Sequence, residues 1–217
     1  MSPTKQIARL LGLPPGQDRL VGDVIMCREF AGPREVCAAL AEVTSLDRQQ
    51  EEALTRLWVD QEKAAVEIPG AARAVMRARE LGFAVGLVSD IWVPYYRAFL
   101  GACPDIAALV DYAALSFRVG RKKPAEELYR AALEALGADP RRSVMIGDTY
   151  EKDILPAINM GLATIWVLSR PEREYPAMAR VLWGEWPRPD IIVRNTSRIA
   201  RALDELEQKR RGTYSWK

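Results

Sequence analysis

Short apolar stretches alternate with helical segments through the second two thirds of this chain, and this alternation limits the folds open to it. The stretches Phe83–Val88, Ser143–Ile146 and Ala163–Leu168 are each brief and largely apolar, and each is predicted to be a strand. Strands without alternating polar residues are typical of parallel sheets that helices cover on both faces. The chain therefore predicts an α/β fold with buried strands.

Other elements follow from the same patterns. Gly82, Gly137 and Gly161 each close a segment of helical periodicity, as glycines commonly do at helix ends. The prolines and tryptophans of Ser169–Pro189 predict an excursion packed on the surface. Further strands are expected at 112–116 and 190–193, and helices at 71–81, 95–100, 125–136, 154–160 and 198–208, the last capped by Asn195 or Thr196.

The first third of the chain has a different pattern. Residues 5–65 show helical periodicity without a convincing strand, although Leu20–Met26 fits either a helix or a strand. The pattern changes at Glu67-Ile68-Pro69-Gly70, which is a predicted hinge. Two domains are therefore expected, a helical one at 1–67 and an α/β core at 68–217.

Composition excludes several classes of function. The chain has no histidine, which excludes Ser-His-Asp and Cys-His triads, histidine bases and histidine-ligated metals. Cys27, Cys37 and Cys103 are scattered without a Cys-x-x-Cys spacing, so we expect reduced thiols in a cytoplasmic protein and no zinc. A net charge of only +2 and apolar runs too short for a bilayer predict neither a nucleic-acid nor a membrane partner.

Two acids follow the strand predicted at 143–146. Asp148 comes after Gly147, a residue that lets the backbone turn sharply, and Asp153 lies five residues further on. Two carboxylates in one small space repel each other unless a cation lies between them, and oxygen ligands suit Mg²⁺. The alternative is a plain turn followed by a helix-capping aspartate.

A hydroxyl and an ammonium group lie near the same sheet edge. Ser89 ends a predicted strand, where a hydroxyl and free backbone N–H groups can bind a phosphate oxygen, and Asp90 could hold a substrate hydroxyl. Lys123 precedes Pro124 and could neutralise charge on a transferring phosphoryl group. The alternatives are an ordinary loop serine and a solvated basic loop.

In this order, Ser89, the Gly-x-x-Lys-Pro run at Lys123 and the Gly-Asp-x4-Asp run at 147–153 resemble motifs two, three and four of the haloacid dehalogenase (HAD)-like hydrolase superfamily. The resemblance implies a three-layer, Rossmann-like parallel-sheet core with an N-terminal all-helical cap at about 5–65. The stretch from Ile68 resembles the return from cap to core, and the stretch from Pro189 resembles the closing strand and helix of the family.

The resemblance also implies roles for individual residues. Ser89 would bind phosphate, and Lys123 would stabilise a phosphoaspartate. Asp148 would ligate Mg²⁺, and Asp153 would hold a metal-bound water or orient Lys123.

The chain departs from the family in one respect, because it contains no Asp-x-Asp. In the family this motif ends the first strand and supplies the nucleophile and the general acid and base. In the family, that strand lies between the strands that end near Ser89 and Asp148. Its absence would leave two facing sheet edges with unpaired backbone groups. Each such group costs about 1–3 kcal/mol of stability if it is buried. We expect a longer natural protein, with this chain starting at an internal Met1, truncated before the nucleophile and inactive as written.

The resulting hypothesis is a Mg²⁺-dependent phosphatase that acts on a small phosphorylated metabolite, with Trp58, Arg28 and Trp92 as candidates for lining the cleft. One alternative is a non-catalytic HAD-like binding or scaffolding protein. A phospho-acceptor signalling domain is disfavoured, because here the lysine precedes the acids and a helical cap is present. Dehalogenation stays open, and the sequence makes no prediction of oligomeric state.

Overall fold

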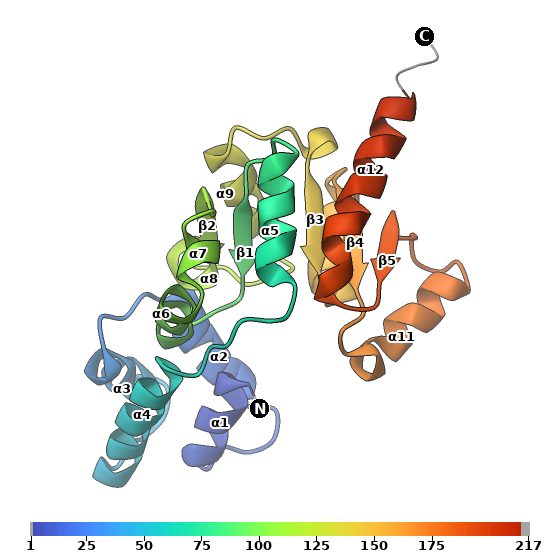
Figure 1. Ribbon diagram of the computed structural model, residues 1–217. Helices are drawn as coiled ribbons and strands as arrows, with labels where there is room; N and C mark the ends of the chain where they lie inside the picture. The colour runs from blue at the N-terminus through green and yellow to red at the C-terminus, as the bar shows by residue number, and fades with distance from the viewer. Residues whose placement is uncertain (1, 214–217) are drawn as a thin grey trace.

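The computed structural model describes residues 2–213, and the Met1 at which an upstream extension was expected lies outside this range. Figure 1 shows helices α1–α4 gathered at one end and an α/β part that holds the strands. The helical end consists of α1 (Pro3–Leu10), α2 (Asp18–Cys27), α3 (Pro33–Ala41) and α4 (Arg48–Gln61). The helices of the α/β part are α5 (Ala71–Glu80), α6 (Val93–Ala102), α7 (Pro104–Ala107), α8 (Ser116–Val119), α9 (Glu126–Ala135), α10 (Leu155–Asn159), α11 (Pro171–Leu182) and α12 (Ile199–Thr213).

The strands are parallel throughout, as their apolar character predicts, but they form two sheets. One sheet pairs β1 with β2, and the other has the order β3-β4-β5. The pairings place Ser89 opposite Leu115, and Gly147 opposite Trp166. The strands are β1 (Gly86–Ser89), β2 (Tyr112–Leu115), β3 (Val144–Gly147), β4 (Ala163–Val167) and β5 (Ile191–Val193).

A groove of about 1140 Å³ separates the two sheets. Its walls come from β1 and β3 and from α5, α9 and α12, and most of the side chains that line it are apolar. Within residues 2–213 no strand pairs with the edge of β1 or of β3 that faces this groove. The two facing edges expected from the family resemblance are therefore present.

The groove corrects the expectation that all strands are buried. In β4 four of the five residues are buried, whereas every residue of β3 and most of β1 are only half-buried. The physical reason is that β1 and β3 border an open space large enough for water. Their unpaired backbone groups can be hydrated there, which avoids much of the cost expected for dry, unpaired edges.

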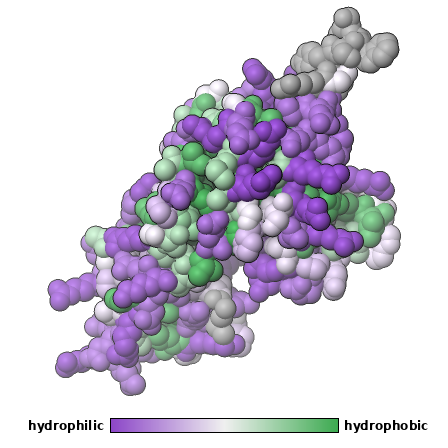
Figure 2. All heavy atoms as spheres, viewed as in Figure 1, coloured by the Kyte–Doolittle hydropathy of each residue, from purple (hydrophilic) through white to green (hydrophobic). Residues whose placement is uncertain are grey.

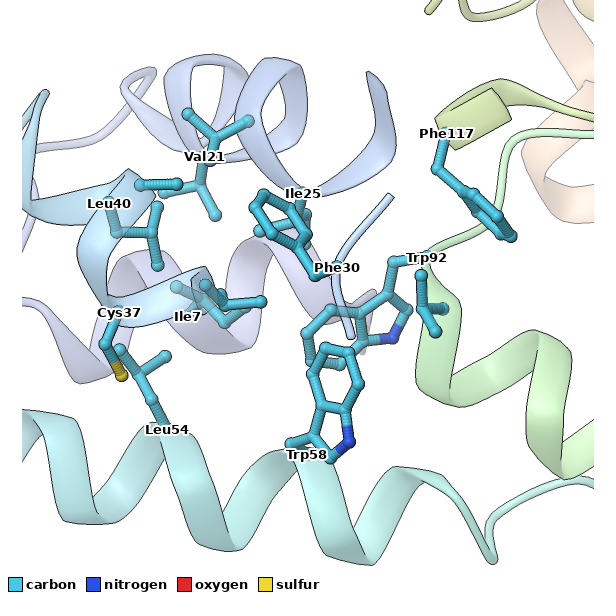
Figure 3. Close-up of a cluster of buried hydrophobic side chains, with 14 of the residues drawn as sticks. Ile7, Val21, Ile25, Phe30, Cys37, Leu40, Leu54, Trp58, Trp92 and Phe117 are labelled. Atoms are coloured by element: carbon cyan, nitrogen blue, oxygen red, sulfur yellow. The ribbon is translucent and has the colours of Figure 1, made fainter. Parts of the chain in front are cut away.

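The helical end packs around its own apolar side chains. Ile7, Ile25 and Leu40 are completely buried and lie in the cluster of Figure 3. Helix α4 begins with a reciprocal cap, because Asp47 accepts from the backbone N–H of Gln50 while the Gln50 side chain accepts from the N–H of Asp47. The cluster continues into the α/β part through Trp92 and residues near β2.

Two tryptophans join the parts and do not line a cleft. Trp58 and Trp92 are each 2% exposed and meet edge to face with ring centroids 5.4 Å apart (Figure 3). Arg28 forms an exposed ion pair with Glu42 within the helical end. The expectation that these three residues line the substrate cleft is therefore wrong for the tryptophans, which are buried as core, and Arg28 has a partner in its own part of the chain.

The structure gives two segments a secondary structure that the sequence left open. Leu20–Met26, which fits either state by pattern, lies inside helix α2. Ser169–Pro189, expected as an excursion packed on the surface, contains the 12-residue helix α11. Pro171 is compatible with a helix because it occupies the first turn, where its missing N–H costs nothing, and only Pro176 lies inside the helix.

The connection between α4 and α5 contains a glycine in the left-handed region. Gly70 precedes α5 with φ of 89°, in the left-handed region. A Cβ at this position would lie 2.6 Å from the Cα of Ser197. The chain therefore enters the α/β part in close backbone contact with the start of the closing helix.

Figure 2 shows a mostly hydrophilic face, with hydrophobic residues exposed around the strands and near α11. Leu182 and Trp183, at the end of α11, are among the exposed large hydrophobic residues. None of the helices described within residues 2–213 has the length and apolar character needed to cross a bilayer.

We predict that Gln61→Leu destabilises the junction between the two parts. Gln61 is 4% exposed, accepts from Trp92 Nε1 at 2.9 Å and donates to Gln6 Oε1 at 2.8 Å. Leucine leaves the buried indole N–H unpaired, at a cost of about 1–3 kcal/mol in unfolding free energy measured with urea. Gln49→Leu, at an exposed position of the same helix, is the control; an equal effect of both variants would contradict the prediction.

Candidate functional site

The turn after β3 can form only with glycine at position 147. The chain leaves β3 at Gly147 and folds into a single π-helical turn, Tyr150–Ile154, which brings Asp153 back beneath the strand end. A Cβ at residue 147 would lie 2.3 Å from the Cβ of Asp153 and 2.5 Å from its Oδ2. Asp153 is buried and accepts from the backbone N–H of Thr149 at 2.9 Å. The glycine is therefore required by this close approach.

A buried ion pair connects this turn to the lysine loop. Lys123 Nζ lies 2.7 Å from Asp153 Oδ1, and the two side chains are 15% and 4% exposed. The backbone N–H of Lys123 donates to Asp90 Oδ1 at 2.7 Å, and Lys152 Nζ lies 3.2 Å from Asp90 Oδ2. Three stretches far apart in sequence thus meet at one rim.

The rim lies at the carboxyl ends of the parallel strands. Ser89 is the last residue of β1 and directly precedes Asp90, and Asp148 directly follows the end of β3. The five residues predicted to form a site therefore gather at this rim: Ser89, Asp90, Lys123, Asp148 and Asp153. Their catalytic and metal-binding roles stay predictions.

The two acids of the turn do not share a cation. Asp153 is paired with Lys123, while Asp148 Oδ2 accepts from the guanidinium of Arg170. Thr149 Oγ1 lies 3.4 Å from Asp148 Oδ1. Each carboxylate therefore has its own positively charged partner, whereas the sequence suggested one metal ion between the two.

The segment around α11 adds residues that the sequence did not indicate. Glu174 is buried and its Oε2 accepts from the backbone N–H of Tyr150 at 2.8 Å. Trp186 stacks on the Tyr150 ring at 5.1 Å, and the Tyr150 hydroxyl donates to the carbonyl of Pro187. Because the segment contains several prolines, the sequence did not indicate the helix. It also did not indicate that the segment packs against the acid turn.

The electrostatics of Glu174 follow from its position. Burial raises the pKa of Glu174, the hydrogen bond from Tyr150 lowers it, and the nearby charges of Asp148, Asp153 and Glu151 raise it further. The folded protein therefore favours the neutral form of this side chain more than the unfolded chain does.

The acids at the rim can hold a metal ion only with help from other ligands. Within residues 2–213, no three His, Cys, Asp or Glu side chains are grouped so that they could hold a metal ion together. Mg²⁺ is usually bound through one or two carboxylates plus waters and substrate phosphate, and a half-exposed Asp148 suits this pattern. Asp153 suits it less well, because Lys123 and the Thr149 N–H already engage both of its oxygens.

Known proteins share both the sequence pattern and the fold. A model of the HAD-hydrolase-like family matches residues 120–195. The glyceraldehyde 3-phosphate phosphatase of Pyrococcus abyssi is 31% identical over 105 residues, which cover 46% of this chain and 42% of that protein. The pyrimidine 5'-nucleotidase of Escherichia coli is 43% identical over 74 residues, which cover 34% of this chain and 32% of that protein.

Solved structures extend the likeness to almost the whole chain. A HAD phosphatase from Thermococcus onnurineus superposes with a TM-score of 0.56 at 20% identity, covering 92% of this chain and 86% of that one. A β-phosphoglucomutase from Clostridium difficile gives a TM-score of 0.59 at 14% identity, covering 96% of this chain and 87% of that one. The chain is therefore similar to HAD-like proteins, in sequence over part of its length and in fold over most of it.

The family-model match includes part of the rim. The matched segment 120–195 contains Lys123, Asp148 and Asp153, and it ends just beyond β5. The chain spans less than half the length of the curated HAD-like relatives described above. A 2-haloacid dehalogenase from Pseudomonas syringae shares the fold equally well, with a TM-score of 0.59 at 17% identity, over 95% of this chain and 83% of that one.

We predict that Lys123→Met lowers the unfolding free energy by about 3–5 kcal/mol, because it leaves the buried Asp153 carboxylate without its cation. Arg48→Met is the control, since the Arg48–Glu52 pair is exposed and its loss should change stability by less than about 1 kcal/mol. Urea unfolding of both variants measures the difference, and similar losses would contradict the buried pair.

We also predict a pH-dependent effect of Glu174→Gln. Because the folded-state pKa is raised, the wild type loses stability as pH rises from the unfolded value of about 4.3 through the folded value. Glutamine can still accept from the Tyr150 N–H but carries no charge. The variant should therefore gain stability relative to the wild type between pH 4 and pH 7 in urea titrations.

The exposed Glu172, in the first turn of the same helix, provides the matched control. Glu172→Gln should leave the pH profile of stability unchanged. A Glu174→Gln variant whose advantage is constant from pH 4 to pH 7 would refute the raised pKa.

Proposed function

We propose that this chain carries the phosphate-binding half of a phosphomonoester hydrolase of the HAD-like type. The observation that carries the proposal is the position of Lys123, whose ammonium group is fixed by Asp153 at the rim where β1 and β3 both end. A fixed positive charge at this place can stabilise the charge of a transferring phosphoryl group.

The other residues of the rim have complementary roles in this proposal. Ser89 offers a hydroxyl to a phosphate oxygen, and Asp90 orients the lysine loop through the Lys123 N–H. Asp148 would hold Mg²⁺ with waters and substrate oxygens, and Asp153 keeps Lys123 in place. When bound, Mg²⁺ supplies further positive charge beside the phosphoryl group.

A phosphoryl acceptor is the missing part of the proposed site. The chain has no Asp-x-Asp, and the groove between β1 and β3 is open to one more parallel strand. We propose that a further segment of the natural protein fills this groove and ends at the rim with an acceptor carboxylate. Residues 1–67 would then act as the cap and 68–217 as the core.

The substrate class is a small phosphorylated metabolite in the cytoplasm. Support comes from the relatives that are named as phosphatases of glyceraldehyde 3-phosphate and phosphoserine and as a nucleotidase. Cys27, Cys37 and Cys103 are free thiols, of which Cys37 and Cys103 are buried, and the proposal places them in a reducing compartment. The near-neutral charge supports neither nucleic acid nor membrane as a partner.

A second candidate is a non-catalytic phosphometabolite-binding protein. The observation that favours it is that Asp90, Asp148 and Asp153 each already have a cationic partner. Such a rim can bind an anion without transferring a phosphoryl group. The two candidates differ in turnover, which an assay can measure directly.

We predict Mg²⁺-dependent hydrolysis of p-nitrophenyl phosphate by a longer form of the protein that carries the acceptor strand, and none by residues 1–217 alone. In the longer form, Lys123→Met should reduce turnover by about 10²–10³-fold, because it removes a charge that stabilises the transition state. Lys122→Met is the matched control, since Lys122 pairs with Asp23 in the helical end.

The absence of turnover in a longer form that does carry an acceptor aspartate would contradict the hydrolase and favour the binding protein. An equal loss of turnover in Lys123→Met and Lys122→Met would contradict the proposed role of Lys123 in the reaction.

A further inference from the structure

Arg170 contributes a positive charge to the rim from outside the three motif-like stretches. It directly precedes α11, and its Nη2 donates to Oδ2 of Asp148. The Asp148 side chain is 35% exposed and that of Arg170 is 48% exposed, so the pair is open to the solvent side of the rim. The carboxylate proposed as the metal ligand is thus already bound to a cation.

The segment that carries Arg170 is fixed to the acid turn by several contacts. Glu174 binds the backbone N–H of Tyr150, Trp186 stacks on the Tyr150 ring, and Pro187 accepts from the Tyr150 hydroxyl. These contacts hold the segment that carries Arg170 against the acid turn. The position of Arg170 beside Asp148 follows from this packing.

A guanidinium and a divalent metal ion compete for the same carboxylate. Direct coordination through Asp148 Oδ2 requires release of the Arg170 guanidinium. Coordination through Oδ1 places a second cation on the same carboxylate, where the two cations repel each other. The other cations of the rim do not compete in this way, because Lys123 pairs with Asp153 and Lys152 pairs with Asp90.

We propose that Arg170 is a built-in competing cation that sets the metal affinity of Asp148. The guanidinium opposes binding of a divalent ion to this carboxylate, by occupying Oδ2 and by charge repulsion, so Arg170 acts through Asp148 and is not a catalytic residue. This inference rests on the proposed function, which assigns Asp148 to the metal.

Mn²⁺ binding to purified residues 1–217 tests the inference, with the free Mn²⁺ signal in electron paramagnetic resonance as the readout. Arg170→Gln should bind Mn²⁺ roughly twofold to fivefold more tightly than the wild type, because the competing charge is gone. Arg170→Lys keeps the charge and should bind less tightly than Arg170→Gln. Arg173→Gln, at an exposed position in the first turn of α11, is the matched control and should leave the affinity unchanged.

Circular dichroism establishes that each variant is folded, and the double variant Arg170→Gln with Asp148→Asn should lose the gain in affinity. Equal or weaker Mn²⁺ binding by Arg170→Gln would overturn the inference and leave the metal assignment of Asp148 intact. A lack of Mn²⁺ binding in every variant would instead remove Asp148 as a metal ligand, and the inference with it.

Discussion

The buried contact between Asp153 and Lys123 is the interaction on which the rim depends. It places a carboxylate beneath the end of β3, where only glycine fits at position 147, and it draws the lysine loop to the same point. The Lys123 N–H then fixes Asp90 at the end of β1. A buried ion pair is costly unless its partners are well hydrogen-bonded, and here the Thr149 N–H supplies the additional bond to Asp153. The Lys123–Asp153 contact thus connects the end of β3 with the end of β1, on opposite sides of the groove.

Much of this arrangement could be predicted from the sequence, because parallel strands end at a common edge. Ser89 and Asp148 lie at the ends of apolar strands, and this position is sufficient to predict that they lie at the same rim. The close approach of Asp153 to Gly147 could not be predicted, since it depends on a π-helical turn. Helix α11 could not be predicted because it contains prolines. The contact of Arg170 with Asp148 could therefore not be predicted either. Local pattern indicates where a strand ends, but long-range packing decides which cation meets which acid.

The second feature that determines the architecture is the division of the strands into two sheets. Strands β1 and β3 have the apolar sequences of central strands, yet they border an apolar groove and are only partly buried. Helices α5, α9 and α12 line the groove and keep its shape, while the helical end packs against the α/β part through Trp92. In the proposed function the rim binds an anion and the groove takes a further strand. The proposed hydrolase needs both, whereas a binding protein needs only the rim.

The central claim is that the rim binds an anion of phosphate geometry between Ser89 and Lys123. A crystal structure of the protein soaked with tungstate, located by anomalous scattering, tests it most directly. The account predicts one tungstate with its oxygens within hydrogen-bonding distance of Ser89 Oγ and Lys123 Nζ. Tungstate bound only at other positions, with this rim vacant, would contradict the account.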